Sequence, residues 1–335
     1  MTTREAAPIL STFTEKEATT LRKTAIRIFT LALALLAGRA GAAPFAYVPN
    51  EGSGTVSIID TATDTVVGEL KAGRKPRGIA ASPDGTRLYV SDQPSNRLVV
   101  FDLGARTEVG SVPLGASPEG VYVSPDGRYV AVASEEGNQV VFIDAAAGKE
   151  AFHVPVKGRN PEHAVFSPDG NTVYASAEDD DVVDVVDVGA RKQVAQVKVA
   201  ARPRGIGFLP DGSCAYVATE NADKVVVIDT ASRKAIAEIA AGKRANGIAV
   251  HPSGQRVFVS NGGDGTVSVI DTKTNAIVAT VPVGKRPWNM ALTPDGRKLY
   301  VANGRSNSVS VIDTDRNEKV RDVAVGELPW GVVVR

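Results

Sequence analysis

Seven residues, spaced 42 or 43 positions apart, include charged and aromatic side chains that are suited to chemistry. Each stands one place after the residue, usually proline, that opens a short apolar run. They are Arg77, Glu119, Glu162, Arg204, Asn246, Trp288 and Trp330. Arginine binds carboxylate or phosphate groups through two parallel hydrogen bonds, and tryptophan presents a flat apolar face to planar or sugar ligands. We therefore predict a binding site for an anionic or planar small molecule, formed by Arg77, Arg204, Asn246, Arg286, Trp288 and Trp330.

Two of the seven residues are glutamates, and His163 directly follows one of them. Carboxylates and imidazole transfer protons during hydrolysis and isomerisation. Glu119, Glu162 and His163 are therefore the candidate catalytic residues of a lactonase-like hydrolase or an isomerase. A channel histidine that only makes hydrogen bonds is the competing interpretation of His163. The sequence has no nucleophile elbow, P-loop or dinucleotide fingerprint. We expect a non-catalytic binding or scaffolding protein, with the enzyme as the alternative.

Metal and cofactor motifs are missing from the sequence. The three histidines have no H-E-x-x-H spacing, and the single cysteine, Cys214, cannot form an internal disulfide or a C-x-x-C-H haem attachment. The acidic stretch Glu178–Asp181 has the hard oxygen ligands that calcium prefers, but not the spacing of an EF-hand. We expect a solvated acidic loop there, an inert Cys214, and neither a metal nor a cofactor.

Basic residues gather in the segments that lead into the apolar runs, and they predict a basic collar. They are Arg74, Lys75, Arg159, Arg202, Lys243, Arg244, Lys285 and Arg286. Acidic loops, Glu135–Glu136 and Glu178–Asp181, are expected on the same face. The whole chain balances 38 basic against 38 acidic residues, which argues against a nucleic-acid partner. Single-stranded nucleic acid, which binds basic grooves with aromatic platforms, stays a third alternative.

A repeat of 42 or 43 residues organises everything after the amino end. The turn Ser82-Pro-Asp-Gly85 returns, with small changes, at 124–127, 167–170, 209–212, 251–254 and 293–296. Each unit contains four runs of four to seven residues rich in Val, Ile, Thr and Tyr, bounded by Gly, Pro, Asn and Asp. Such runs are typical of strands and turns. Each unit also carries an aspartate that we expect to bond local turn backbone. These are Asp60, Asp102, Asp144, Asp187, Asp229, Asp271 and Asp313.

Four strands per unit and seven units predict an all-β fold, a single seven-bladed β-propeller over residues 43–335 with four antiparallel strands per blade. A parallel β-helix is the alternative, but its turns are much shorter than 42 residues. The chain ends with one strand of a unit, Pro329–Arg335, and the repeat begins with the next strand, around Tyr47. We therefore expect the N- and C-terminal strands to pair and close the ring, which hides two strand edges.

The first 42 residues have the features of a secretory signal. Residues 28–37 are mainly apolar, basic residues precede them, and Ala40-Gly41-Ala42 forms a cleavage site. The apolar run is too short for a stable transmembrane span. We expect a signal peptide over 1–42 and a periplasmic or secreted mature chain with no transmembrane segment.

The repeat resembles the YVTN family of bacterial and archaeal propellers. The resemblance is carried by Tyr47-Val-Pro-Asn50, Tyr89-Val-Ser-Asp92 and Tyr300-Val-Ala-Asn303, and it weakens where Ala177 and Thr219 replace the Asn. The segments ending in Trp288 and Trp330 are similar to the propeller that accompanies PQQ-dependent alcohol catabolism. That similarity implies an accessory protein of quinoprotein oxidation whose partner is a periplasmic dehydrogenase or cytochrome. The propeller resemblance also implies that the loops leading into the innermost strands and those joining the second and third strands share one face.

Overall fold

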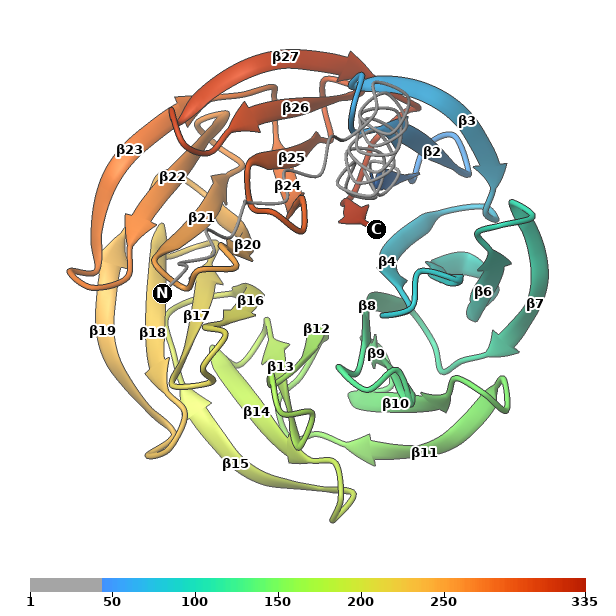
Figure 1. The fold of residues 1–335 in the computed structure, drawn as a ribbon. Coiled ribbons are helices and arrows are strands. Elements are labelled where there is room, and N and C mark those ends of the chain that lie inside the picture. The colour runs from blue at the N-terminus through green and yellow to red at the C-terminus, as the bar shows by residue number, and fades with distance from the viewer. Residues whose placement is uncertain (1–43) are drawn as a thin grey trace, which may run out of the picture. The chain divides into compact units, whose positions relative to one another are not determined.

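Residues 44–335 form a ring of seven four-stranded antiparallel sheets in the computed structural model, which describes this part of the chain (Figure 1). The seven-bladed propeller predicted from the repeat is therefore confirmed. None of the elements between residues 44 and 335 is a helix long and apolar enough to cross a membrane. The predicted signal peptide lies outside the described residues.

Each blade contributes one innermost strand to the channel and one second strand behind it. The innermost strands are β4 (Pro76–Ala81), β8 (Pro118–Val123), β12 (Pro161–Phe166), β16 (Pro203–Phe208), β20 (Ala245–Val250), β24 (Pro287–Leu292) and β28 (Val333–Val334). The second strands are β1 (Phe45–Asn50), β5 (Arg87–Asp92), β9 (Tyr129–Ser134), β13 (Thr172–Ala177), β17 (Cys214–Thr219), β21 (Arg256–Asn261) and β25 (Lys298–Asn303). A short 3-10 turn, η1 (Gln93–Ser95), follows β5.

The third and fourth strands complete each blade toward the rim. The third strands are β2 (Thr55–Asp60), β6 (Arg97–Asp102), β10 (Gln139–Asp144), β14 (Val182–Asp187), β18 (Lys224–Asp229), β22 (Thr266–Asp271) and β26 (Ser308–Asp313). The outer strands are β3 (Thr65–Lys71), β7 (Thr107–Pro113), β11 (Lys149–Pro155), β15 (Lys192–Lys198), β19 (Lys234–Ala240), β23 (Ala276–Pro282) and β27 (Glu318–Ala324).

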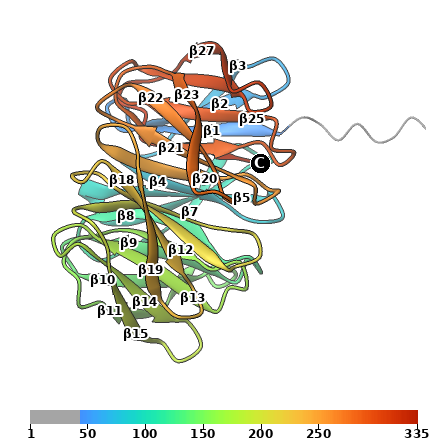
Figure 2. The same cartoon turned by 90° about the vertical axis from the view of Figure 1, so that its left-hand side faces the viewer.

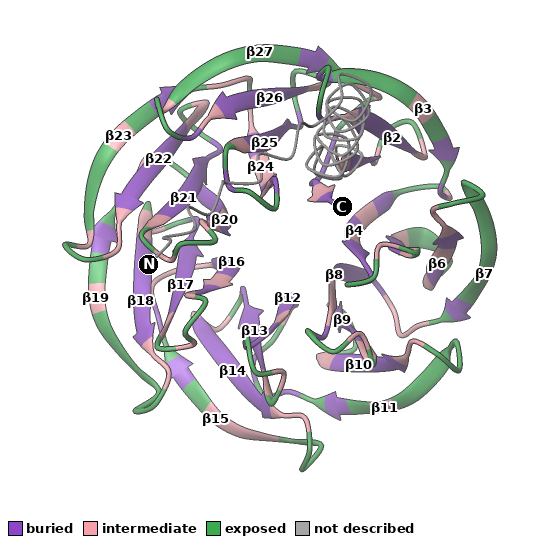
Figure 3. Ribbon diagram, viewed as in Figure 1, coloured by how far each residue is buried: buried purple, intermediate pink, exposed green. Residues whose placement is uncertain are grey.

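The apolar runs of the sequence lie in the middle of the blades. Second and third strands are buried on both faces because each blade packs between two others, whereas the outer strands are mostly exposed (Figure 3). Strands covered on both faces read as continuous apolar runs rather than as an alternation. Seven apolar clusters between neighbouring blades make up the core. Figure 2 shows the blades from the side.

The ring is closed by the two ends of the repeat region, as predicted. Tyr47 of β1 pairs with Val333 of β28, and Phe45 and Arg335 exchange two backbone hydrogen bonds. Ahead of β28, the Trp330 N–H donates to the Pro49 carbonyl at 2.9 Å. The strand is shorter than the predicted Pro329–Arg335, because regular pairing covers only its last part and a single bridge joins Pro329 to β1.

Seven aspartates that end the third strands bond the turn that follows, as predicted. Asp60 accepts from the Thr63 N–H at 3.4 Å, and each of the other six accepts from the N–H three residues further on, at 2.8 to 3.0 Å. In the Pro-Asp-Gly turns, Asp84 accepts from the Thr86 N–H at 3.0 Å. These repeated acids are therefore used for turns, which leaves the variable residues of the opposite face as the candidate site.

Candidate functional site

The seven residues singled out by their spacing form a ring around one mouth of the channel. We call these residues, Arg77, Glu119, Glu162, Arg204, Asn246, Trp288 and Trp330, the strand ring. In β4 the pairing with β5 passes from Pro76 directly to Ile79, so Arg77 lies outside the regular ladder. The same irregularity recurs in β8, β16, β20 and β24. Residues at such bulges can turn their side chains away from the sheet.

A second ring, which the sequence analysis did not recognise, surrounds the first. It consists of the residue that directly follows each second strand, and we call it the loop ring: Glu51, Gln93, Glu135, Glu178, Glu220, Gly262 and Gly304. In each blade, the backbone N–H of the loop-ring residue donates to a backbone carbonyl. This carbonyl belongs to the residue two positions before the strand-ring residue, and the bonds are 2.9 to 3.4 Å long. The two kinds of loop therefore share one face, as the propeller resemblance implied. The signal for this ring was present, because its members have the same 42- or 43-residue spacing.

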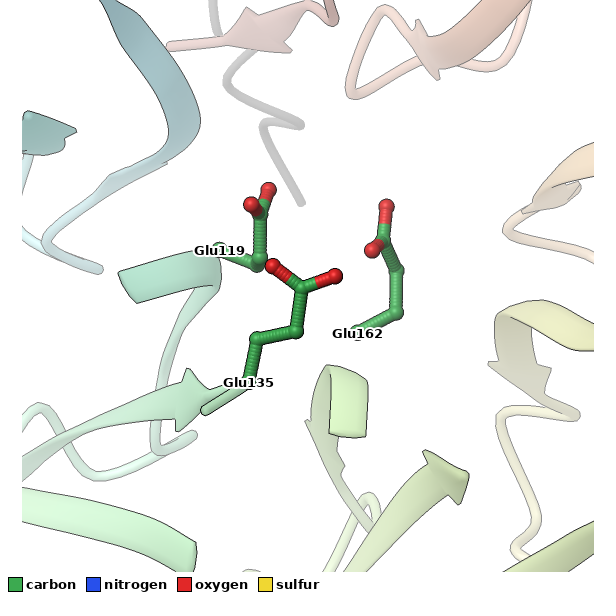
Figure 4. A group of neighbouring side chains, drawn as sticks. All are labelled: Glu119, Glu135 and Glu162. Atoms are coloured by element: carbon green, nitrogen blue, oxygen red, sulfur yellow. The ribbon is translucent and has the colours of Figure 1, made fainter. Parts of the chain in front are cut away.

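Three carboxylates from the two rings converge at the mouth (Figure 4). Glu119 of β8, Glu135 of the β9–β10 loop and Glu162 of β12 each place an oxygen within 4.8 Å of the other two. Neighbouring side chains also hold each of them. Gln93 and Arg77 donate to Glu119 Oε1 at 2.6 and 2.5 Å, Ser117 donates to Glu135 Oε2 at 2.6 Å, and Arg204 lies 3.1 Å from Glu162 Oε1. Glu119 and Glu162, predicted from the sequence, are thus joined by Glu135.

The electrostatics of this carboxylate cluster favour a proton on Glu119. Burial raises the pKa of Glu119 well above its usual value of 4.5, and the negative charges of Glu162 and Glu135 raise it further. Arg77, which pairs with Glu119 Oε1 at 2.5 Å, lowers the pKa but does not outweigh these effects. A carboxyl group with a raised pKa beside two further carboxyl groups is an arrangement that enzymes use for proton transfer.

A second group of charges lies beside the cluster, centred on Glu220. The carboxylate of Glu220 contacts four arginines of three blades: Arg202, Arg204, Arg244 and Arg286, at 2.7 to 3.4 Å. Burial on its own would raise the pKa of Glu220, but the arginines, led by Arg204, lower it below its usual value. Three of the eight residues of the predicted basic collar, Arg202, Arg244 and Arg286, thus pair with a glutamate that the sequence analysis did not single out.

The acidic stretch Glu178–Asp181 is divided between buried and exposed positions. Glu178 is only 4% exposed and pairs with Arg202 at 2.9 Å and with Arg204. The expectation of a solvated loop is therefore wrong for Glu178, because its place in the loop ring turns it toward the arginines. Asp180 and Asp181 are more exposed and pair with Arg159 and Lys198.

The predicted aromatic wall consists of one accessible and one buried tryptophan. Trp288 is half-buried. A Cβ atom at position 304 would lie only 2.5 Å from Cζ3 of the Trp288 ring. Gly304 therefore makes room for Trp288. Trp330 is 8% exposed, and its ring centroid lies 5.7 Å from that of His163, which comes from β12.

His163 and Asn246 are both buried. Tyr122 and His163 Nδ1 are hydrogen-bonded at 2.7 Å, and burial lowers the pKa of His163 to about 4. Its neutral, hydrogen-bonded state matches the structural interpretation of this residue. Asn246 is 2% exposed, and its amide nitrogen has no hydrogen-bond partner among residues 44–335.

The predicted ligand-binding arginines all take part in ion pairs at the mouth. Arg77 contacts Glu51 and Glu119, Arg204 contacts Glu162 and Glu220, and Arg286 contacts Glu220. Cys214 lies away from this face at the start of β17, where burial raises its pKa. A cavity of about 470 Å³ opens among the Pro-Asp-Gly turns. Its two aspartates, Asp169 and Asp211, accept hydrogen bonds from the backbone of their own turns.

Comparison with known proteins identifies the family. A model of the family described as "Lactonase, 7-bladed beta-propeller" matches residues 41–151 and 163–326. The chain belongs to this lactonase family. The match covers most of the propeller, including Glu119, Glu135 and the arginines around Glu220.

Several solved structures share the propeller. Hydrazine synthase of Kuenenia stuttgartiensis is 25% identical with a TM-score of 0.74, over 80% of this chain and 91% of that one. A protein of unknown function from Desulfotomaculum acetoxidans DSM 771 is 17% identical with a TM-score of 0.77, covering 87% of this chain and 98% of that one. A provisionally named 6-phosphogluconolactonase from Bacteroides uniformis ATCC 8492 is 21% identical with a TM-score of 0.75, covering 88% and 100%.

One curated relative matches over a short stretch. The PE-PGRS family protein PE_PGRS18 of Mycobacterium tuberculosis (strain ATCC 25618 / H37Rv) is 54% identical over 37 residues, which is 11% of this chain. The match spans 8% of the length of that protein.

Membership of the lactonase family corrects the functional expectation from the sequence. A non-catalytic binding or scaffolding protein was expected, and the family match points to a lactonase-like hydrolase, which was the alternative. The expectation relied on the missing nucleophile elbow and P-loop. Those motifs carry chemistry on one contiguous segment, whereas this mouth assembles Glu119, Glu135 and Glu162 from separate strands and loops.

Proposed function

We propose that this protein hydrolyses a cyclic ester at the mouth of the propeller. The observation that carries the proposal is the convergence of Glu119, Glu135 and Glu162 in a chain that belongs to the lactonase family. Ester hydrolysis requires a base that activates water and an acid that protonates the leaving oxygen. A cluster that holds carboxylates beside a carboxylic acid supplies both.

The chemistry assigns a role to each carboxylate. Glu135, the half-buried member, takes a proton from a water molecule whose oxygen adds to the lactone carbonyl carbon. The bond from that carbon to the ring oxygen then breaks, and the ring oxygen receives a proton from Glu119, whose raised pKa keeps it protonated. The product is one hydroxy acid. Arg204, beside Glu162, supplies positive charge near the developing oxyanion.

The substrate class follows from the residues around the cluster. Trp288 offers a partly accessible flat face, and Arg286 lies 5.9 Å from its ring centroid. A sugar lactone has faces of C–H groups that pack on aromatic rings, and an anionic substituent is attracted by arginine. We therefore infer a small, planar or anionic lactone, with Arg77, Arg204, Asn246, Arg286, Trp288 and Trp330 as its binding residues.

A panel of lactones tests this function. Hydrolysis would be followed by proton release for neutral, acidic and phosphorylated sugar lactones. We expect turnover by the wild type and a loss of about 100-fold or more in Glu135→Gln, the size typical of removing a general base. Asp180→Asn, which changes a half-buried carboxylate of the same face outside the cluster, is the matched control. Equal turnover by wild type and Glu135→Gln would remove the carboxylate cluster from the reaction.

Export from the cytoplasm and a partner protein are two further proposals, and both rest on the sequence. The basic, apolar and small-residue pattern of residues 1–42 supports export to the periplasm or beyond. The similarity to propellers of PQQ-dependent alcohol catabolism agrees with a supply of lactone by a dehydrogenase, because oxidation of a cyclic hemiacetal yields a lactone. Sequencing the amino end of protein from the periplasmic fraction tests the first point. Co-purification with a dehydrogenase or cytochrome tests the second.

A further inference from the structure

We propose that Glu119, Glu135 and Glu162 bind one divalent cation, with Ca²⁺ as the preferred ion. Carboxylate oxygens are hard ligands, which favour Ca²⁺, Mg²⁺ or Mn²⁺ over softer metals. Ca²⁺ takes oxygen ligands at about 2.3–2.6 Å, so two of its ligands can lie up to about 5 Å apart. The three glutamates each place an oxygen within 4.8 Å of the others, which fits one shared Ca²⁺.

An unsatisfied atom points to a ligand in this cluster. Glu119 is completely buried, and its Oε2 has no hydrogen-bond partner among residues 44–335. Buried polar atoms nearly always have a partner, because leaving one unpaired costs about 1–3 kcal/mol, and more for a charged group. The partner of Glu119 Oε2 is therefore either a proton or a cation.

The surrounding charges do not neutralise the cluster. Arg77 is shared between Glu119 and Glu51, and Arg204 is shared among Glu162, Glu178 and Glu220. No cation of the described residues contacts Glu135. Carboxylates this close repel each other strongly in a buried site, so a bound cation relieves more unfavourable energy here than it would at the surface.

The neighbours of the three glutamates leave one oxygen of each available. Gln93 and Arg77 hold Glu119 Oε1, Ser117 holds Glu135 Oε2, and Arg204 holds Glu162 Oε1. No hydrogen bond or ion pair within residues 44–335 involves the other oxygen of any of the three. Metal-binding carboxylates are commonly oriented in this manner by a second set of hydrogen bonds.

The site is confined to neighbouring blades. At the strand-ring positions, only β8 and β12 carry glutamate, and the other blades carry arginine, asparagine or tryptophan. Glu135, from the blade of β8, lies in the loop ring between them. A proton and a cation compete for Glu119 Oε2, so the protonated Glu119 of the proposed hydrolysis and the bound cation belong to different states of the protein. The cation proposal does not rest on the hydrolysis, and each is tested separately.

Calorimetric titration of metal-free protein with CaCl₂ tests the proposal directly. We expect saturable binding of one equivalent, with a parallel rise in the thermal midpoint, and an affinity reduced at least about tenfold in Glu135→Gln and Glu162→Gln. Glu135 is half-buried, so its glutamine variant should fold, and its melting curve without added ion checks this. Asp180→Asn, the control outside the cluster, should bind like the wild type. MgCl₂ and MnCl₂ titrations rank the ions.

Two results would overturn the proposal. One is no saturable binding of Ca²⁺, Mg²⁺ or Mn²⁺ up to about 10 mM, well above the dissociation constants of weak extracellular calcium sites. The other is undiminished binding by the folded Glu135→Gln and Glu162→Gln variants. Lactone hydrolysis by protein that binds no ion would leave the proposed function intact, and ion binding by a protein without hydrolytic activity would leave the cation site intact.

Discussion

The carboxylate of Asp184 accepts the hydrogen bond of the Gly158 N–H, at 2.9 Å. In two other blades an asparagine at the end of the second strand accepts the equivalent bond, as Asn261 does from Gly242 and Asn303 does from Gly284, both at 3.1 Å. The blade of Asp184 has Ala177 at that place, one of the positions where the YVTN pattern weakens. Asp184 on the neighbouring strand β14 therefore replaces the missing asparagine.

Replacing Asp184 should reveal this exchange. Asp184→Ser should destabilise the protein by about 1–3 kcal/mol, because the Gly158 N–H and the amides of Gln193 and Gln196 lose their acceptor. The double variant Ala177→Asn, Asp184→Ser recreates the Asn and Ser pair of the other blades and should recover most of the loss. Thermal melting of the three proteins measures it. A double variant no more stable than Asp184→Ser would contradict the exchange.

Deleting Pro329 to Arg335 should destabilise the protein far more than seven residues suggest. The deletion exposes the edge of β1 and removes buried Trp330, whose loss alone costs about 3–5 kcal/mol. A fall of about 10 °C in the thermal midpoint is expected. Trp288→Ala, at a half-buried position, is the matched control and should cost less. If the truncated protein melted within about 2 °C of the intact one, closure would not contribute to stability.

The stability of cation-free protein should fall as the pH rises from about 4.5 toward neutrality. The pKa of Glu119 is raised in the folded protein above its usual value of 4.5, so the folded state holds this proton more tightly than the unfolded state. As the pH rises above the usual value of 4.5, Glu119 ionises more readily in the unfolded state, and the free energy of unfolding therefore falls. Glu119→Gln should lack this component. Melting midpoints of both proteins between pH 4.5 and 8 measure the difference, and parallel profiles would refute the raised pKa.

His163 should have the opposite effect on acid stability. Burial lowers its pKa from 6.5 to about 4, so the unfolded state takes up a proton first as the pH falls. The contribution of the neutral ring is complete above pH 6.5 and is lost between 6.5 and 4, by about 3 kcal/mol in total. His163→Asn, which introduces the residue found at the corresponding Asn289, should show a weaker acid transition. Unfolding free energies measured in urea at several pH values test this, and equal slopes would contradict it.

Gly304→Ala should weaken lactone binding through Trp288. A methyl group at 304 would lie 2.5 Å from Trp288 Cζ3, so the indole ring must move. We expect altered tryptophan fluorescence and a lower affinity, with neither the fluorescence change nor the loss of affinity in Gly110→Ala, where nothing lies within 4 Å. Tryptophan emission unchanged from wild type would show that the ring tolerates the methyl group.

The fold could be predicted from the sequence because each repeat contains residues that strongly favour turns and strands. It predicted the strand ring for the same reason, since Glu119 and Glu162 have equivalent positions in neighbouring units. Glu135 and Glu178 could only be described as acidic loop residues, and Glu220 attracted no attention. Their partners were not predictable, because Arg204 reaches carboxylates of three different loops and strands, and such distances depend on side-chain conformations that spacing does not encode.

Every residue of the loop ring is bonded through its main-chain N–H to the segment that leads to the strand ring of its own blade. The bonds from Glu51 to Leu328, from Glu220 to Arg202 and from Gly304 to Arg286 are made by N–H and carbonyl groups, so they require no particular side-chain functional group. Residues of the loop ring and the strand ring can therefore be substituted during evolution without a change in the fold of the blades. Residues of the strand ring and the loop ring can therefore be varied together in a library. New combinations of acids, bases and aromatic groups can then be screened on an unchanged scaffold.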